Sequence, residues 1–247
     1  MVAKMKQPDR TLVTALDPFM TAHGFKFIGS RGGYYRKYAG GFDYFSWGTY
    51  PLATGEKWEA GYHEGHYGVG MRFDKVEELT SEVMPIYGAD NQKYAFTTYR
   101  GVGNPAGNWF AFDPSRDEGL CLRFDHLEAD VAETVGRIAA MLEADGWAWY
   151  ERYADAVALS RDVNDPMGGI APHPLVNNAT NRPLVGIAAA CVSEPERVPA
   201  LIDGWLSVAR EWDEQAEGAR PPMAPDFARK FALITDKARE LGYLELR

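Results

Sequence analysis

Cysteines and long apolar runs are both scarce in this chain of 247 residues. Its two cysteines, Cys121 and Cys191, stand between apolar neighbours, where a free buried thiol is more typical than a disulfide. No apolar run approaches the roughly 20 residues that a membrane-spanning helix needs. The first residues also lack the apolar core of a signal peptide. We therefore expect a soluble, cytoplasmic protein with no membrane partner.

Motifs that identify the common enzyme classes are also missing. No serine lies in a Gly-x-Ser-x-Gly turn, and there is neither a Walker A sequence nor a dinucleotide fingerprint. The glycine-rich segment 29–33 is followed by a strand pattern, so it predicts a hairpin turn and not a phosphate loop. We expect no cofactor and favour a non-catalytic protein, with a catalytic site assembled from distant residues as the alternative.

The residue pattern changes near Phe124 and Asp125. Before this point, short aromatic runs alternate with glycine-rich turns, which is typical of an antiparallel sheet. After it, apolar residues recur at helical spacing among alanine and acidic side chains. We predict an α+β protein with an antiparallel sheet of about 5–7 strands in its N-terminal half, covered on one face by an N-terminal helix and C-terminal helices. The chain is either one domain over 1–247, or a sheet-rich part over 1–125 with a helical part over 126–247 packed on it.

Individual elements follow from local spacing and turn residues. Strands are expected at 25–28, 34–38, 43–50, 66–73, 94–100, 109–112 and 120–124. Helices are expected before Gly24, at 76–84, 127–142 and 147–161, from 198 onward, and at 226–241 with Asp226 as N-cap. Residues 163–183 are rich in proline, glycine and asparagine and predict a long loop. Such a loop would cover a pocket, contact a partner, or separate a helical part.

Alternation along the strands predicts a sheet face with tyrosine and arginine side chains. Within 43–50, Phe45 and Trp47 fall on one face, which we expect the helices to cover, and Tyr44 falls on the other. Tyrosine and arginine recur at binding surfaces because both offer a large contact area with a polar tip. An ordinary half-solvated sheet face has the same composition. The candidate binding residues are Tyr34, Arg36, Tyr38, Tyr44 and Arg72.

The best candidate for chemistry is the run His63, Glu64, Gly65, His66. Histidine and glutamate together indicate a metal or acid–base site. A zinc-binding helix needs histidines four residues apart, whereas these are three apart in a segment that leads into a strand. The candidate metal ligands are His63, Glu64, His66 and, through the tertiary fold, His126.

Negative charge is concentrated just after the change of pattern. Residues 113–165 hold 13 acidic and 5 basic side chains, which accounts for −8 of the net charge of −9. Such a segment repels nucleic acid and attracts a basic partner, although a solvated helix surface is the simpler interpretation. The aromatic-basic strand 34–38 is the single feature in favour of nucleic acid. We expect no nucleic-acid partner and a basic protein partner; no feature indicates an oligomeric state.

The order of several segments resembles a bacterial domain family of unknown function. The resemblance lies in the opening helix with His23-Gly24-Phe25-Lys26, the strand beginning Tyr34-Tyr35-Arg36-Lys37, the strand 67–73 and the helix start at 147–152. Some relatives of that family resemble immunity proteins that neutralise toxins, which implies a protein-binding module of antitoxin or immunity type. The alternative is a small-molecule enzyme, such as a metal-assisted hydrolase, that uses His63, Glu64 and His66.

Overall fold

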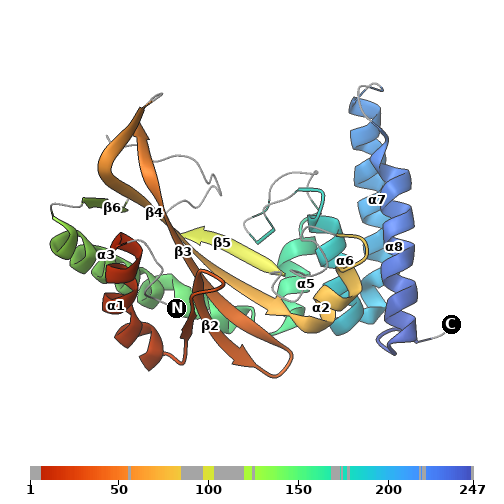
Figure 1. Cartoon of the computed structure of the whole chain (residues 1–247). Helices are drawn as coiled ribbons and strands as arrows, with labels where there is room; N and C mark the ends of the chain where they lie inside the picture. Colours follow the sequence, from red (N-terminus) through yellow and green to blue (C-terminus); the bar gives the residue numbers. More distant parts are fainter. Residues whose placement is uncertain are drawn as a thin grey trace. The chain divides into compact units, whose positions relative to one another are not determined.

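The computed structural model describes two compact units of the chain (Figure 1). The described residues are 7–54, 57–84, 97–102, 120–123, 126–167, 173, 175–176, 179–216, 218 and 221–245; within them, the side chains of 47–54, 57–67, 99–102, 120–121 and 123 lie outside the description. Unit 1 comprises Met1–Gly70 and Arg100–Glu151, and unit 2 comprises Met71–Tyr99 and Arg152–Arg247. The chain therefore passes between the units three times, and neither unit is one continuous segment.

An antiparallel sheet near the N-terminus confirms the predicted α+β class. Its strands lie in the order β1-β2-β3-β4-β5, with β6 paired to β4. Their bounds are β1 (Lys26–Ile28), β2 (Gly33–Tyr38), β3 (Gly41–Thr54), β4 (Lys57–Phe73), β5 (Thr98–Val102) and β6 (Leu120–Arg123). The turn between β1 and β2 is the predicted hairpin, with Gly32 at a φ of 63° that favours glycine. The strand expected at 109–112 lies outside the described residues.

Strands β3 and β4 are longer than the sequence pattern predicts. The expected strands at 43–50 and 66–73 extend to Thr54 and back to Lys57. The sequence pattern predicted that the first strand stops before Pro51, because proline has no N–H to donate to a neighbouring strand. A sheet accepts proline where no neighbouring strand needs that N–H. The pairing of β2 with β3 ends at Ser46, so Pro51 lies beyond it.

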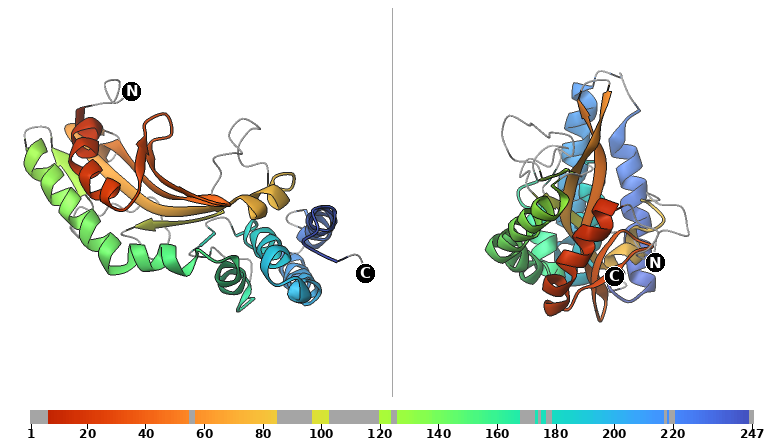
Figure 2. Two further views of the ribbon diagram at one scale, coloured as in Figure 1. Left: turned by 90° about the horizontal axis from the view of Figure 1, so that it is seen from below. Right: turned by 60° about the vertical axis from the view of Figure 1, so that its left-hand side comes forward.

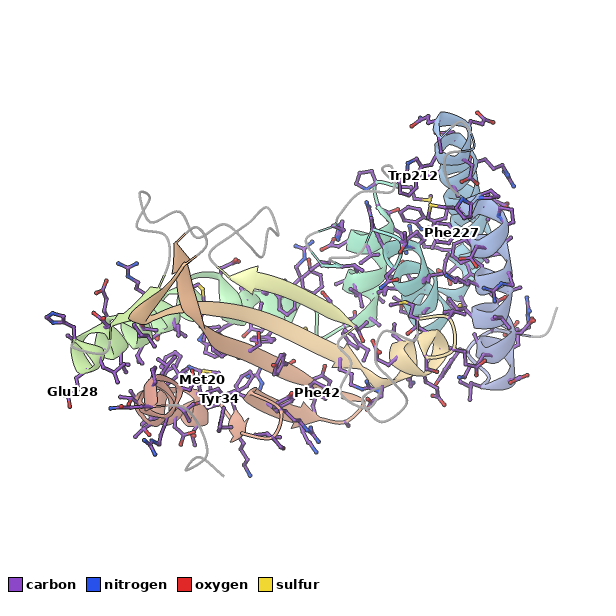
Figure 3. The ribbon with its side chains drawn as sticks, turned by 45° about the horizontal axis from the view of Figure 1, so that its top comes forward. Met20, Tyr34, Phe42, Glu128, Trp212 and Phe227 are labelled. Atoms are coloured by element: carbon purple, nitrogen blue, oxygen red, sulfur yellow. The ribbon has the colours of Figure 1, made fainter. Side chains whose placement is uncertain are left out.

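Unit 1 holds the helices that precede and follow the sheet in sequence: α1 (Gln7–Ala22), α3 (Leu127–Met141), the π-helical turn η3 (Leu142–Gly146) and α4 (Trp147–Arg152). Helices α1 and α3 lie side by side (Figure 2). Leu12, Leu16 and Met20 are buried on one face of α1, and Figure 3 shows Met20 close to Tyr34 of β2. Helix α1 ends at Ala22, and Gly24 follows it with a φ of 82°, the expected left-handed cap.

Unit 2 is built mainly from helices: α2 (Asp74–Thr80), α5 (Ala156–Asn164), α6 (Arg182–Ser193), the 3₁₀ turn η4 (Pro195–Arg197), α7 (Val198–Gln215) and α8 (Met223–Glu240). Helix α6 packs against α2, α5, α7 and α8 and is buried from Arg182 to Cys191. The loop expected at 163–183 overlaps the end of α5 at 163–164 and the start of α6 at 182–183, so its predicted bounds were wrong at both ends. The sequence pattern did not predict α6.

Two helix boundaries differ from the predictions. The single helix expected at 147–161 is interrupted, because Asp155 starts a new helix by accepting a hydrogen bond from the Val157 N–H at 2.9 Å. Asp226 is not the N-cap of the last helix, which begins at Met223. The cap is supplied by Asp213 of α7, whose carboxylate accepts hydrogen bonds from the N–H groups of Met223 and Ala224 at 2.7 and 2.8 Å.

Candidate functional site

Tyr34, the first of the candidate binding residues, belongs to the core. The register of β2 and β3 places Tyr34 opposite Phe45, so it shares the face that we expected the helices to cover. Its side chain is fully buried, and its hydroxyl donates a hydrogen bond to the Val13 carbonyl of α1 at 3.2 Å. Burial, and secondarily the charge of Asp17, raises the pKa of the Tyr34 hydroxyl. Tyr34 therefore fixes α1 to the sheet.

Arg36 is held between a carboxylate and two aromatic rings. Its Nε and Nη2 both lie 2.7 Å from Asp43 Oδ2, and its guanidinium lies over the rings of Phe25 and Tyr150 at 4.8 and 5.5 Å. Asp43 is 3% exposed; burial raises the pKa of its carboxyl, although Arg36 acts in the opposite direction. This ion pair joins β2, β3 and α4 within unit 1.

Tyr44 and Tyr38 complete the candidate residues of unit 1 and differ in exposure. Tyr44 lies opposite Tyr35 on the other face of the sheet, where their rings are 4.7 Å apart and both side chains are buried. A Cβ at Gly33 would collide with the ring of Tyr44, so glycine is required there. Tyr38, at the end of β2, is 37% exposed. Tyr34 and Tyr44 thus lie on opposite faces of the sheet.

Arg72, the fifth candidate, lies in unit 2. Its Nε donates to Asp74 Oδ1 at 2.6 Å, and its Nη1 lies 3.9 Å from Glu77 Oε2. The other Glu77 oxygen accepts a hydrogen bond from the Thr97 hydroxyl at 2.8 Å. Burial raises the pKa of Glu77 against the effects of Thr97 and Arg72. The five candidates do not form one tyrosine–arginine face, and their role in binding stays a prediction.

The candidate metal ligands are only partly described. His63 and Glu64 lie in β4, paired across the sheet with Leu122 and Cys121. The side chains of His63, Glu64 and His66 are outside the described part, so their metal binding stays a prediction. His126 is exposed immediately before α3. Among the residues that the structure describes, no three histidine, cysteine, aspartate or glutamate side chains come together in a group suited to a metal ion.

Helices α3 and α4 with the turn η3 present an exposed acidic surface, which we call the acidic face. It consists of Glu128, Glu133, Glu143, Asp145 and Glu151. Figure 3 shows Glu128 at the outer end of α3. Of the two arginines in these elements, Arg137 forms an i,i+4 pair with Glu133 at 2.6 Å and Arg152 pairs with Asp162 at 2.7 Å. Five of the 13 acidic side chains of 113–165 are thus exposed on these helical elements of unit 1.

Small residues occupy the other exposed positions of the same surface: Ala129, Ala132, Gly136, Ala140, Ala144 and Ala148. A helix surface with short side chains lets another backbone approach closely, because no long side chain must be displaced. Short side chains therefore lie between the acidic ones along this surface.

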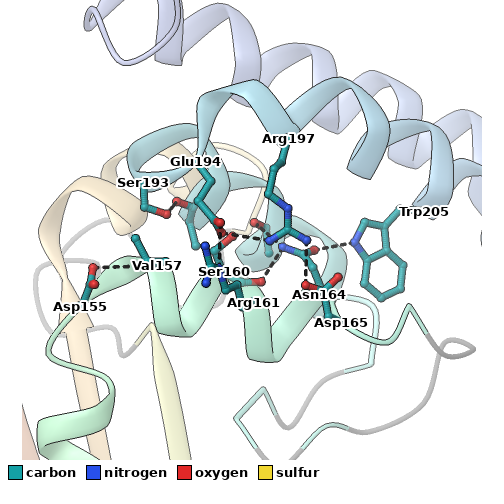
Figure 4. A network of polar contacts seen from close by, with 12 residues as sticks. Asp155, Val157, Ser160, Arg161, Asn164, Asp165, Ser193, Glu194, Arg197 and Trp205 are labelled. Carbon is teal, nitrogen blue, oxygen red and sulfur yellow. Dashed lines mark hydrogen bonds and ion pairs between the residues drawn. The ribbon is translucent and has the colours of Figure 1, made fainter.

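A buried polar network joins three helices of unit 2 (Figure 4). Asn164 of α5 is fully buried and donates from Nδ2 to the carbonyls of Ser160 and Gly186 at 2.8 and 3.0 Å. Its Oδ1 accepts a hydrogen bond from Trp205 Nε1 of α7 at 2.8 Å. A Cβ at Gly186 would collide with the Asn164 amide. One side chain therefore links α5, α6 and α7.

Glu194, at the end of α6, forms the charged part of this network. Its Oε1 accepts from Arg161 Nε at 2.9 Å and its Oε2 from Arg197 Nη1 at 3.0 Å, while Arg197 Nη2 also donates to Asp165 at 2.7 Å. Burial alone would raise the pKa of Glu194, but the hydrogen bonds from Arg161 and Arg197 hold it below its ordinary value. The Ser160 hydroxyl is buried beside this carboxylate without hydrogen-bond geometry. Charges paired within the network are typical of a structural role.

Arg182 is a buried cation that the sequence reasoning missed. It is 6% exposed, and it donates to the carbonyls of Val163 and Pro166 at 2.9 and 2.8 Å. Its guanidinium lies 5.2 Å from the centre of the Trp205 ring. These carbonyls lie at and just beyond the end of α5, where a cation is stabilised by the helix dipole. Arg182 stands in a segment with the composition of a loop, so no local pattern marked it.

Cys191 confirms the expectation of a buried free thiol. It is fully buried in α6, and burial raises the pKa of its thiol to about 12. A thiol that stays protonated at neutral pH is a poor nucleophile and a poor metal ligand. The side chain of Cys121 is outside the described part.

Comparison of the chain with protein-family models, with curated proteins and with solved structures finds no match in any of the three. The resemblance to a bacterial domain family therefore stays a prediction. None of the helices in the described residues has the length and apolarity needed to cross a membrane.

Proposed function

We propose that this chain is a non-catalytic protein-binding module that recognises a basic protein partner through the acidic face of unit 1. The observation that supports this proposal is the exposure of Glu128, Glu133, Glu143, Asp145 and Glu151 on one helical surface. Complementary charge accelerates encounter and excludes partners of like charge. A neutraliser of a basic toxin, of antitoxin or immunity type, is the partner class that this chemistry fits.

The arrangement of the remaining charged groups supports binding in preference to catalysis. Two of the carboxylates that are buried in the described residues, Asp43 and Glu194, are engaged by arginine. A catalytic carboxylate needs access to a substrate, whereas these two hold secondary-structure elements together. The acidic face, by contrast, is open to solvent, and the two arginines of the same elements, Arg137 and Arg152, are each paired with a carboxylate.

A pair of variants with equal charge tests the proposal. The first neutralises the acidic face by Glu128→Gln, Glu133→Gln, Glu143→Gln, Asp145→Asn and Glu151→Gln. The second removes the same charge from exposed residues of unit 2 by Glu196→Gln, Asp203→Asn, Glu211→Gln, Glu214→Gln and Glu240→Gln. Each is immobilised beside the parent chain, and binding of the purified products of neighbouring genes is followed at low and high salt.

We expect the parent and the unit 2 variant to bind a basic neighbour with an association rate that falls as salt rises. The acidic-face variant should associate roughly tenfold or more slowly at low salt, because the steering charge is gone. Equal binding by the two variants would show that the acidic face is not the contact surface. Failure of every neighbouring product to bind the parent would refute the proposed partner class.

A further inference from the structure

The imidazole ring of His173 closes a turn in unit 2 formed by His173, Leu175 and Val176, which we call the His173 turn. His173 Nδ1 accepts a hydrogen bond from the Leu175 N–H at 3.2 Å. The main chains of His173 and Val176 add two hydrogen bonds, at 3.0 and 3.4 Å. A side-chain acceptor for the N–H two residues later is what asparagine and aspartate provide in an Asx turn. Here a titratable ring takes that position.

The His173 turn is part of the core of unit 2 and holds the first residue of β5. Leu175 and Val176 are 3% and 7% exposed. The Leu175 carbonyl accepts a hydrogen bond from the Thr98 hydroxyl at 2.7 Å, and Thr98 is itself 2% exposed. A change in the turn would therefore leave a buried hydroxyl without its acceptor, which costs free energy.

Charged groups from both neighbouring helices act on the His173 ring. Arg182 of α6 is held in place by its two carbonyl acceptors, so its guanidinium would stay near the ring if His173 became positively charged. Asp162 of α5 acts on the ring through its main chain and its carboxylate, but the carboxylate is already engaged by Arg152 at 2.7 Å and Tyr153 at 2.6 Å. Burial, and then Arg182, lowers the pKa of His173, whereas Asp162 acts in the opposite direction.

We propose that the His173 turn is a pH-sensitive latch, which opens when His173 takes up a proton from solvent and so releases Leu175 from Thr98. An imidazolium carries N–H groups on both nitrogens, so Nδ1 can no longer accept the Leu175 N–H. The new charge would also lie near the fixed guanidinium of Arg182. The latch is independent of the acidic face and of the proposed basic partner.

The direction of the pH effect follows from the preference for the neutral ring. The unfolded chain binds a proton with the ordinary histidine pKa of about 6.5, and the folded turn binds it less readily. The stabilisation by the latch is therefore complete above this pH and is lost as the pH falls through the lower pKa of the folded state.

Hydrogen exchange of the Leu175 and Val176 amides on the full chain tests the latch. Protection is measured at neutral and at mildly acidic pH and corrected for intrinsic exchange. In the parent, acidification should lower it about fivefold, the equivalent of one net hydrogen bond of ~1 kcal/mol. His173→Asn keeps an acceptor at this position without titrating, so its protection should not change with pH. His173→Leu has no acceptor and should show low protection at both pH values.

A matched control separates the latch from a general effect of acid. His126→Asn makes the same substitution at an exposed histidine of unit 1 and should leave the parental pH response of Leu175 intact. The latch is refuted if the parent shows no loss of protection on acidification, or if His173→Asn loses as much as the parent.

Discussion

The two units hold distant parts of the chain together by different means. In unit 1, aromatic rings of α1, of the turn after it and of α4 pack together, for example His23 on Trp147 with centroids 4.3 Å apart. In unit 2, hydrogen bonds from Asn164 join three helices. Aromatic contact is distributed over many atoms and tolerates small displacements, whereas a buried polar network loses stability when a single partner is removed. Unit 2 should therefore be the unit more sensitive to single substitutions.

The largest effect expected from this comparison is that of Asn164→Ala. The substitution leaves Trp205 Nε1 and the Gly186 carbonyl without partners inside the core, so we expect a loss of about 3 kcal/mol of unfolding free energy. Hydrogen exchange should show the loss in peptides of α5, α6 and α7. Asn181→Ala, at an N-cap whose side chain makes no capping bond, is the control and should cost far less. An equal loss in β1 and β2 peptides would contradict separate stabilisation of the units.

A smaller effect is expected from Arg36→Met in unit 1. It leaves the Asp43 carboxylate buried without its cation, a change that costs several kcal/mol when both groups are fully buried. Arg36 has a side chain 36% exposed to solvent, so we expect about 2 kcal/mol at neutral pH. Chemical denaturation followed by tryptophan fluorescence would measure it.

The same ion pair gives a pH dependence with a defined sign. Burial raises the folded pKa of Asp43, and loss of Arg36 removes the group that lowers it. The penalty in Arg36→Met is therefore present above the folded pKa and is relieved as acidification protonates the carboxyl. The double variant Arg36→Met with Asp43→Asn should recover most of the stability at neutral pH. If it does not, packing of Arg36 on Phe25 and Tyr150 is the larger contribution.

The smallest effect concerns the start of α8. Asp213→Ala removes the carboxylate that caps two N–H groups of this helix, and we expect a cost of about 1 kcal/mol. Asp226→Ala removes only surface ion pairs with Arg229 and Lys230, and should cost about 0.3–0.5 kcal/mol. Thermal unfolding of the two variants compares these costs directly. A larger loss of stability in Asp226→Ala than in Asp213→Ala would instead support Asp226 as the N-cap, as the sequence predicted.

Sequence periodicity predicted the helices that have one apolar and one polar face. Helices α1, α3, α7 and α8 are of this kind, and their buried residues repeat at helical spacing. Helix α6 was missed because it is buried all round, so no polar residues alternate with its apolar ones. The cap of α8 was misassigned because Asp213 lies 10 residues before the N–H that it binds.

The composition of the candidate surfaces was predictable, but their placement was less so. Charge counting located the acidic segment, because exposed acids on one helix are close in sequence. The prediction of a single tyrosine–arginine face was wrong, because the residues lie on different strands and only the strand register decides which of them share a face. Tyr34 pairs with Phe45, and Tyr44 pairs with Tyr35, so the two candidate tyrosines lie on opposite faces of the sheet.

The threefold passage of the chain between units has a consequence for biosynthesis. As the chain leaves the ribosome, the strands up to Gly70 appear first, but α3 and η3 of the same unit follow only after Met71–Tyr99 of the other unit has been made. Unit 1 is complete once Glu151 has emerged, whereas unit 2 must hold its early segment Met71–Tyr99 until Arg152–Arg247 has been made, so unit 1 is the unit that can fold first. For the same reason, no single cut in its gene separates one unit cleanly from the other.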